Sequence, residues 1–217
     1  MRFPLVLALA LAAAGLSGCA ATMQSAANTQ YADDFFDGNA LARGGLALLP
    51  VTAGQGQEAY RRPFGNALNA AMDSIGRGYG INVTPWDRTM RAINDADLTS
   101  DYNEALRGYR ETSIIDAGLL RQIGEHTGRR YILYTLLGDF EAGAVAGRNV
   151  ISGDLEAHGA AQTAAFAQIW DTQSGDVVWE GRGEASQRGS TYTRVDSDPA
   201  AYTRAVAVAL ADEIMGR

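Results

Sequence analysis

Several residue types are scarce in this sequence, and each scarcity limits the class of protein. Among 217 residues there is one cysteine and there are two histidines, which excludes an internal disulfide framework and disfavours a cysteine- or histidine-rich metal site. Lysine is absent, so all 18 basic residues are arginine, against 25 acidic residues. The formal net charge of −7 argues against a nucleic-acid partner, because such binders need a basic face for phosphates.

The chain nevertheless has the composition of a folded protein. Hydrophobic residues make up 47% and charged residues 20% of it, which is enough apolar side chain for a core. The length fits one domain or two small ones. No internal repeat is visible.

The N-terminus has the pattern of an export signal. A basic start at Arg2 precedes an uncharged apolar run from Phe3 to Leu16. This run is shorter than the roughly 20 residues that a membrane-spanning helix needs, and it fits the apolar region of a secretory signal. We therefore expect residues 1–18 to be a signal peptide.

The run ends at the only cysteine of the chain, in the sequence Leu16-Ser17-Gly18-Cys19-Ala20. This resembles the bacterial lipobox, in which small residues before an invariant cysteine are recognised by a signal peptidase. The resemblance implies cleavage after Gly18 and acylation of Cys19, with fatty acids such as palmitate. Ala20 in place of aspartate implies an outer-membrane address with the domain facing the periplasm. The alternative is an ordinary signal peptide that happens to contain a cysteine.

The sequence predicts a tether followed by one domain. Residues 19–43 lack sustained periodicity and are rich in small and polar residues, so we expect a flexible, lipidated tether with at most a local helix near Tyr31–Phe36. Residues 44–217 form the predicted periplasmic domain.

Apolar patterning across residues 44–217 predicts an α/β fold, with a single mixed β-sheet and packed helices in the rough order β-α-β-α-α-β-β-β-α. The strongest strand is 131–137, which is rich in β-branched and aromatic residues. A long hairpin loop is expected within 138–161. Asp116 and Asp198 are placed as helix N-caps, Gly76 as a helix end, and 171–175 as a hairpin turn. The remaining predicted strands are 44–51, 81–84, 164–171 and 176–180, and the helices begin near 57, 85, 100, 116 and 198.

Two stretches imitate ligand-binding loops. Gly54-Gln55-Gly56 lies between a strand and a helix, as in a dinucleotide-binding turn, but no acidic ribose partner ends the next strand at Thr84. The oxygens of the run from Asp95 to Asn103 alternate as in a calcium loop, but Ser100 replaces the glycine that the sharp turn requires. A strand-to-helix loop and a solvated helix connection explain these stretches better, so we expect no cofactor and no metal.

No catalytic constellation is visible, and we expect a non-enzymatic protein. His126 lies at a helix end, where a cation is stabilising, and His158 lies in a region rich in glycine and alanine. Ser152 and Ser174 both lack the first glycine of a nucleophile elbow. Dispersed triad members cannot be located from one sequence.

Three further groups of residues have a structural and a functional interpretation. Arg129-Arg130 is either a solvated strand entry, which we favour, or an anion site. Trp170 and Trp179 flank the predicted hairpin and are expected in the core. Four tyrosines are open to either interpretation, because interfaces favour tyrosine: Tyr60, Tyr109, Tyr192 and Tyr202.

Three segments together with the lipobox resemble one family. They are the first strand Gly45-Leu46-Ala47-Leu48-Leu49-Pro50-Val51, the strand entry Gly128-Arg129-Arg130-Tyr131-Ile132-Leu133, and the hairpin from Ala167 to Trp179. The chain from about 44 to 215 is similar to the periplasmic group that contains the curli secretion subunit CsgG, the penicillin-binding-protein activator LpoB and the N-terminal domain of TolB. The resemblance implies an α/β domain used for protein contact and assembly, with no catalytic residues.

The sequence departs from the specific activities of that group. A secretion pore needs membrane hairpins with alternating apolar residues, and charged residues such as Asp139, Glu141 and Arg148 interrupt 138–161. An activator that crosses the cell wall needs a longer tether. We therefore expect an outer-membrane lipoprotein that binds an envelope protein or itself. The alternatives are an oligomeric, CsgG-like secretion or export component and a periplasmic small-ligand binder or hydrolase.

Overall fold

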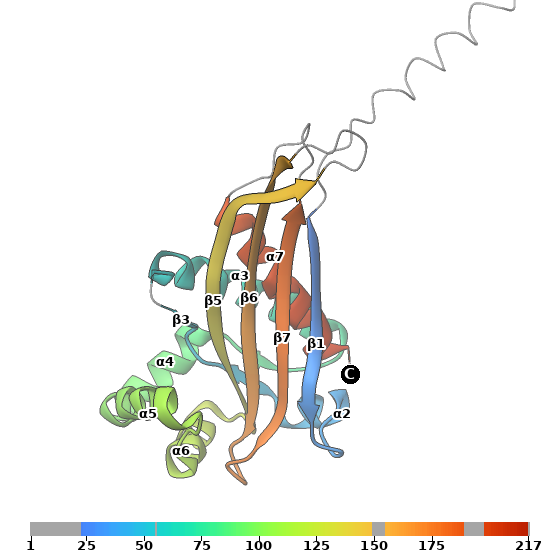
Figure 1. Cartoon of the computed structure of the whole chain (residues 1–217). Helices are drawn as coiled ribbons and strands as arrows, with labels where there is room; N and C mark the ends of the chain where they lie inside the picture. Colours follow the sequence, from blue (N-terminus) through green and yellow to red (C-terminus); the bar gives the residue numbers. More distant parts are fainter. Residues whose placement is uncertain (1–22, 55, 149–154, 189–197, 217) are drawn as a thin grey trace, which may run out of the picture.

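A seven-stranded mixed sheet organises the part of the chain that the computed structural model describes, residues 23–54, 56–148, 155–188 and 198–216. The strand order is β1-β7-β6-β5-β2-β4, with β3 beside β5 (Figure 1). Neighbours from β1 to β5 are antiparallel, whereas β2, β3 and β4 pair in parallel. This confirms the predicted mixed sheet. The strands are β1 (Gln24–Ala32), β2 (Leu46–Leu48), β3 (Thr52–Ala53), β4 (Val83–Thr84), β5 (Tyr131–Arg148), β6 (Leu155–Asp171) and β7 (Val177–Arg188).

The helices cover the two faces of the sheet unequally. Helices α3 and α7 lie along one face, and α4, α5 and α6 lie at one end of the molecule, against the other face (Figure 1). From β2 onward the order agrees with the predicted one, except for the short β3. The rough order counts two helices before β5, whereas the structure has three, α4, α5 and α6, which begin close to the predicted starts at 85, 100 and 116. The helices are α2 (Gly38–Gly44), α3 (Glu58–Gly78), α4 (Trp86–Asp95), α5 (Thr99–Thr112), α6 (Ala117–Thr127) and α7 (Pro199–Met215). In these described ranges no helix combines the length and apolarity needed to cross a bilayer.

Alternating side chains of β5 enter two separate cores. Leu133 and Leu137 face α3 and α7, whereas Ile132 and Tyr134 face the core beneath α4–α6. Since strands covered on both faces are apolar at every position, the segment 131–137 is recognisable as a strand from its sequence. The predicted core positions of Trp170 and Trp179 are confirmed, with exposed fractions of 3% and 0%.

The local signals at helix ends and turns are largely confirmed. The Asp116 and Asp198 carboxylates accept hydrogen bonds from the backbone N–H groups of Leu119 and Ala200 at 2.8 and 3.0 Å. Gly175 has a φ of +83° in the β6–β7 turn, a conformation that favours glycine. The predicted helix end at Gly76 is wrong: Gly76 is buried inside α3, which continues to Gly78.

The prediction of a flexible tether up to Arg43 is wrong for the described residues. Residues 24–32 form β1, the edge strand beside β7, and residues 38–44 form α2. The local helix therefore lies after Tyr31–Phe36, with Asp37 as its N-cap. Most side chains of β1 are exposed, because its backbone pairing with β7 positions it without an apolar stripe. The domain thus begins about 20 residues earlier than predicted. The predicted signal peptide and Cys19 lie outside the described residues.

The segment expected as a long hairpin loop is mostly strand. β5 continues to Arg148 and β6 begins at Leu155, in antiparallel register from Phe140↔Thr163 to Arg148↔Leu155. A bulge between Leu137 and Phe140 separates this extension from the apolar run. The extension is rich in glycine and alanine, so it lacks the side-chain pattern by which strands are recognised.

Candidate functional site

The two stretches that imitate ligand-binding loops have ordinary structural roles. Gly54 and Gly56 belong to the connection between β3 and α3, while Gln55 lies outside the described residues. Residues 99–103 form the first turns of α5 rather than a loop, so their oxygens do not alternate around one point. In the described part of the chain, no group of three or more His, Cys, Asp or Glu side chains could hold a metal ion.

The candidate catalytic residues do not form a visible constellation. His126 is exposed on the last turn of α6, beside Arg88, Arg91 and Asp95. The side chain of His158 and all of Ser152 lie outside the described part. Ser174 lies in the β6–β7 turn, where its Oγ accepts a hydrogen bond from the Asp176 backbone N–H at 3.2 Å.

Two of the four tyrosines belong to the core rather than to an interface. The Tyr202 hydroxyl is hydrogen-bonded to Gln187 Oε1 at 2.9 Å, and the Tyr109 hydroxyl donates to Gln168 Oε1 at 2.6 Å. Both tyrosines are buried. Tyr60 is half-buried against the core of α3 and α7, and Tyr192 lies outside the described residues.

A buried polar network explains why tyrosines occur beneath α5. Tyr109 packs on Tyr134 with ring centroids 4.4 Å apart, and the Tyr134 hydroxyl accepts from Thr52 Oγ1 at 2.7 Å. Gln168 in turn donates to Glu180 Oε1. Burial raises the pKa of Tyr102, Tyr109 and Tyr134 above the ordinary tyrosine value. Tyr109 and Tyr134 therefore stay neutral and act as a structural donor and acceptor, whereas the buried Tyr102 hydroxyl has no hydrogen-bond partner among the described residues.

Beyond the covered end, one face of the sheet is bare. On the face opposite α7, the core beneath α4–α6 includes Trp170 of β6 and Val177 of β7, and Gln168 contacts Tyr109 of α5. Farther along β6, β7 and β1, toward Gln162 and Glu184, no described helix packs on this face (Figure 1). An open groove of about 570 Å³ runs over this face. It is polar, with an Arg182–Glu184 ion pair at 2.7 Å and a hydrogen bond from Gln162 to Glu141 at 2.7 Å. The cross-strand register assigns these residues to the bare face: Gln162, Ala164, Phe166, Arg182, Glu184, Ser186, Ala26, Asn28 and Gln30.

The bare face ends at an unprotected sheet edge. Among the described strands, β1 pairs only with β7, so its other edge has no backbone partner. Its nine residues contain no charge and no proline, although natural edge strands are usually blunted by such residues. Tyr31 and Phe35, at the end of this strand, are 47% and 89% exposed. Edge strands with these properties are suited to pairing with another chain.

A second surface feature lies near α2, at the same end of β1 as Tyr31 and Phe35. Arg43, Arg121, Arg129 and Arg130 line an open cleft of about 740 Å³ between α2, α6 and the β6–β7 turn. The sequence suggested only the Arg129-Arg130 pair. Arg43 could not be associated with that pair because it belongs to a distant segment, and Arg121, eight positions before Arg129, lies on α6, whose orientation the sequence does not give.

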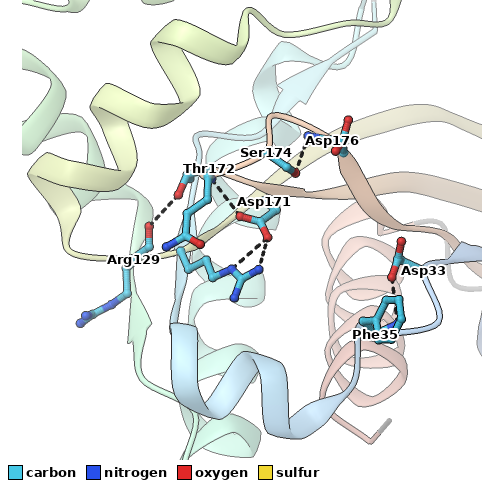
Figure 2. Close-up of polar contacts among 9 residues, drawn as sticks. Asp33, Phe35, Arg129, Asp171, Thr172, Ser174 and Asp176 are labelled. Atoms are coloured by element: carbon cyan, nitrogen blue, oxygen red, sulfur yellow. Dashed lines mark hydrogen bonds and ion pairs between the residues drawn. The ribbon is translucent and has the colours of Figure 1, made fainter.

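The two arginines of the pair have different surroundings. Arg130 Nε and Nη2 donate to Asp171 Oδ2 at 2.9 and 2.6 Å, and Asp171 Oδ1 accepts from the Gln173 backbone N–H (Figure 2). This hydrogen bonding raises the pKa of the Arg130 guanidinium. Arg129 Nη2 donates to Asn82 Oδ1 at 2.8 Å. Arg130 therefore ties the strand entry to the hairpin turn, and is more than the simple solvated residue that we favoured.

Comparisons with known proteins identify structural neighbours but no family. No protein-family model matches the chain, and no curated protein matches its sequence. The dodecamer-forming PelC from Paraburkholderia phytofirmans is similar in structure over 88% of this chain and 97% of that chain, with a TM-score of 0.45 and 12% identity.

Two lipoproteins are also among the neighbours. The LpoB C-terminal domain from Salmonella enterica aligns over 70% of this chain and 86% of that one, with a TM-score of 0.38 and 14% identity. A lipoprotein from Neisseria meningitidis aligns over 73% and 90%, with a TM-score of 0.36 and 13% identity. LpoB thus appears both in the sequence resemblance and among the structures. A likeness at this level assigns no function to the chain.

Proposed function

We propose that this chain is an outer-membrane lipoprotein, anchored through Cys19 and facing the periplasm, whose sheet domain acts as a non-enzymatic binding or assembly module for an envelope protein. One observation supports the protein-binding role: the bare sheet face ends at the uncharged edge of β1, which has no partner among the described strands. The proposed cleavage by signal peptidase after Leu16, Ser17 and Gly18 supplies the anchor, and it rests on the sequence motif.

The start of β1 supports an arrangement close to the membrane. Gln24, the first residue of β1, follows Cys19 by five positions. At no more than about 3.5 Å per residue, this stretch spans roughly 17 Å when fully extended. A domain anchored in this way stays at the membrane surface, so its partner is expected to reach that surface too.

The edge of β1 supports recognition by strand addition. A partner strand laid along β1 would form main-chain hydrogen bonds, and the bare face beside it would select side chains. The exposed rings of Tyr31 and Phe35 add apolar contact area at one end of this edge. Because the face is mostly polar, we expect regulated rather than permanent contact.

Self-association is the second candidate function. It is favoured by a second unpaired sheet edge, which belongs to the later part of β5. Parallel pairing of β5 with β2 and β3 ends at Leu137, so in the described residues β5 has no partner on that side from Gly138 to Arg148. β1 and β5 run in opposite directions because three antiparallel pairings separate them. A β1 edge placed against the β5 edge of another copy would therefore continue an antiparallel sheet, and such a head-to-tail contact can close into a ring.

The proposal is tested by crosslinking in membranes, followed by affinity purification. The native protein is compared with Cys19→Ser, which removes the anchor, and with Asn28→Lys, which adds a charge to the exposed edge. Asn103→Lys, at an exposed position of α5, is the matched control. We expect the native protein to fractionate with the outer membrane and to capture a small set of envelope proteins, and Asn28→Lys to lose that set.

Each outcome separates the parts of the proposal. Release of Cys19→Ser from membranes supports the anchor, whereas its retention as an integral protein overturns it. Crosslinked ladders of the chain itself that Asn28→Lys abolishes favour the second candidate. If Asn28→Lys and Asn103→Lys behave alike, the edge is not the binding surface.

A further inference from the structure

The arginine cleft is a concentration of positive charge in an acidic protein. The chain has a formal net charge of −7, yet four of its arginines line one cleft, and Glu125 is the only acidic residue among the described residues that line it. We propose that this cleft binds the carboxylates of an acidic peptide segment. The binding surface is separate from the sheet edge of the proposed function.

Several guanidinium groups in the cleft have donors to spare. In the described part of the chain, neither Arg43 nor Arg121 has a carboxylate within 4.0 Å or a hydrogen-bonding partner for its side chain. Arg130 uses only Nε and Nη2 for Asp171, which leaves Nη1, and its side chain is 46% exposed. A guanidinium binds a carboxylate by donating two parallel N–H···O bonds. Together, these arginines can therefore bind more than one carboxylate.

The cleft is rigidly built at its base. A Cβ atom on Gly124 of α6 would lie 2.5 Å from Thr172 Oγ1, and one on Gly44 would lie 2.7 Å from the Tyr131 ring. These close approaches hold α6 and the end of α2 against the turn and strand that carry Thr172 and Arg130. Arg121 and Arg43 therefore project from fixed supports, which reduces the entropy lost on binding.

Size and lining favour a peptide over other anions. A volume of about 740 Å³ is within the roughly 300–1,000 Å³ of ligand sites and exceeds what one small anion fills. No aromatic side chain is among the described lining residues, although nucleic-acid bases are usually bound by stacking on such rings. The exposed Gln173 supplies a side-chain amide that can pair with a peptide backbone.

The position of the cleft gives the direction of approach. The cleft includes α2, near the end of β1, whereas Gln24 begins β1 at the opposite end of the sheet (Figure 1). This step rests on the proposed function: with the anchor before Gln24, the cleft faces away from the membrane. A soluble or extended periplasmic segment can therefore reach it, and lipid headgroups of the anchoring membrane cannot.

The test measures binding of a fluorescent hexaglutamate peptide to the full lipoprotein in detergent, by anisotropy at low salt. Hexaglutamine is the uncharged control peptide, and inorganic phosphate is the competing small anion. The variants are Arg43→Gln, Arg121→Gln and their double variant. Arg204→Gln, at an exposed position of α7 outside the cleft, removes the same charge elsewhere.

We expect saturable binding of hexaglutamate that hexaglutamine does not compete for. Each cleft variant should weaken it about tenfold, as loss of one charge-assisted hydrogen-bonding group predicts, and Arg204→Gln should change it less than twofold. Unchanged circular dichroism of the exposed-site variants shows that folding is intact.

Three results would overturn the proposal. They are equal binding of both peptides, equal weakening by Arg204→Gln, and displacement by phosphate at concentrations that match the peptide. The last result would identify a small-anion site. Membrane fractionation and partner capture do not depend on Arg43 or Arg121, so failure here leaves the proposed function separately testable.

Discussion

The two ends of the sheet differ in how they are covered. Around Ile132 and Leu133 the sheet lies between α3 and α7 on one face and α4–α6 on the other. Around Gln162 and Glu184 the described residues cover only the α7 face and leave the opposite face bare. The covered end contains continuous apolar strands with buried tyrosine hydroxyls, whereas the half-covered end alternates small inward residues with polar outward ones.

This difference separates stability from recognition within one sheet. Parallel strands need helices on both faces, and antiparallel strands tolerate solvent on one. β5, β6 and β7 extend beyond the parallel strands. One face of this extension packs on α7, and the other face is left without a covering helix among the described residues. Substitutions should therefore affect folding at one end and binding at the other.

The largest expected effect is at the doubly covered end. Leu133→Ala should lower the free energy of unfolding by about 3 kcal/mol, because the buried side chain leaves a cavity. Phe166→Ala, at a half-buried position on the bare face, should cost clearly less. Urea denaturation, monitored by tryptophan fluorescence, measures the loss of unfolding free energy in both variants. Equal losses would mean that the two ends share one core.

Alkaline pH should destabilise the covered end next. The pKa values of Tyr102 and Tyr109 are raised in the fold, chiefly by burial, whereas the unfolded chain ionises near pH 10. The unfolded state therefore loses protons first. The contribution of these tyrosines to stability is constant below about pH 10 and falls above it, by about 1.4 kcal/mol per pH unit for each tyrosine.

Urea midpoints measured between neutral and alkaline pH test this expectation. The double variant Tyr102→Phe, Tyr109→Phe should show a shallower decline, since two titrating groups are gone. An unchanged decline would place the alkaline sensitivity elsewhere in the chain.

The hairpin turn at the covered end should show an intermediate effect. Asp171→Ala removes both the Arg130 ion pair and the acceptor for the Gln173 N–H, and we expect a loss of about 2 kcal/mol, because the Asp171 side chain is buried but Arg130 is half exposed. Asp171→Asn keeps an acceptor for the turn and should recover part of the loss. Thermal denaturation of the two variants distinguishes the two contributions.

The smallest effect is expected on the bare face. In the Arg182–Glu184 ion pair both side chains are at least half exposed, and such pairs contribute less than about 1 kcal/mol. Arg182→Gln should change the free energy of unfolding by no more than about 0.5 kcal/mol while altering partner capture in the crosslinking assay. A large loss of stability would show that this face has a structural role.

The elements that sequence reasoning predicted well are those whose signals are local. The caps Asp116 and Asp198, the turn at Gly175 and the run 131–137 each depend on neighbouring residues, so one sequence suffices. β1 was missed because its stability comes from pairing with β7, more than 140 positions away, and from Thr29, which accepts from Trp179 Nε1 and donates to Glu213.

The candidate sites were less predictable for the same reason. Arg129-Arg130 was visible as a pair, but its cleft depends on Arg43 and Arg121, which only the fold brings to the same place. The sequence did not predict the bare face. The residues of β6 that point to the opposite, buried face, such as Ala161, Thr163 and Ala165, are themselves small or polar. Their narrow contrast with the outward residues gives little hydrophobic alternation.

The direction of β1 has a mechanical consequence. The strand begins at Gln24, five positions after Cys19 in the sequence, and runs along the length of the sheet against β7 (Figure 1). A pull transmitted from an acyl anchor would act along β1, so the hydrogen bonds from Gln24 to Ala32 would bear the load together in shear instead of opening one after another. In an anchored protein, the segment predicted as a flexible tether would therefore be the strand that carries the load into the domain.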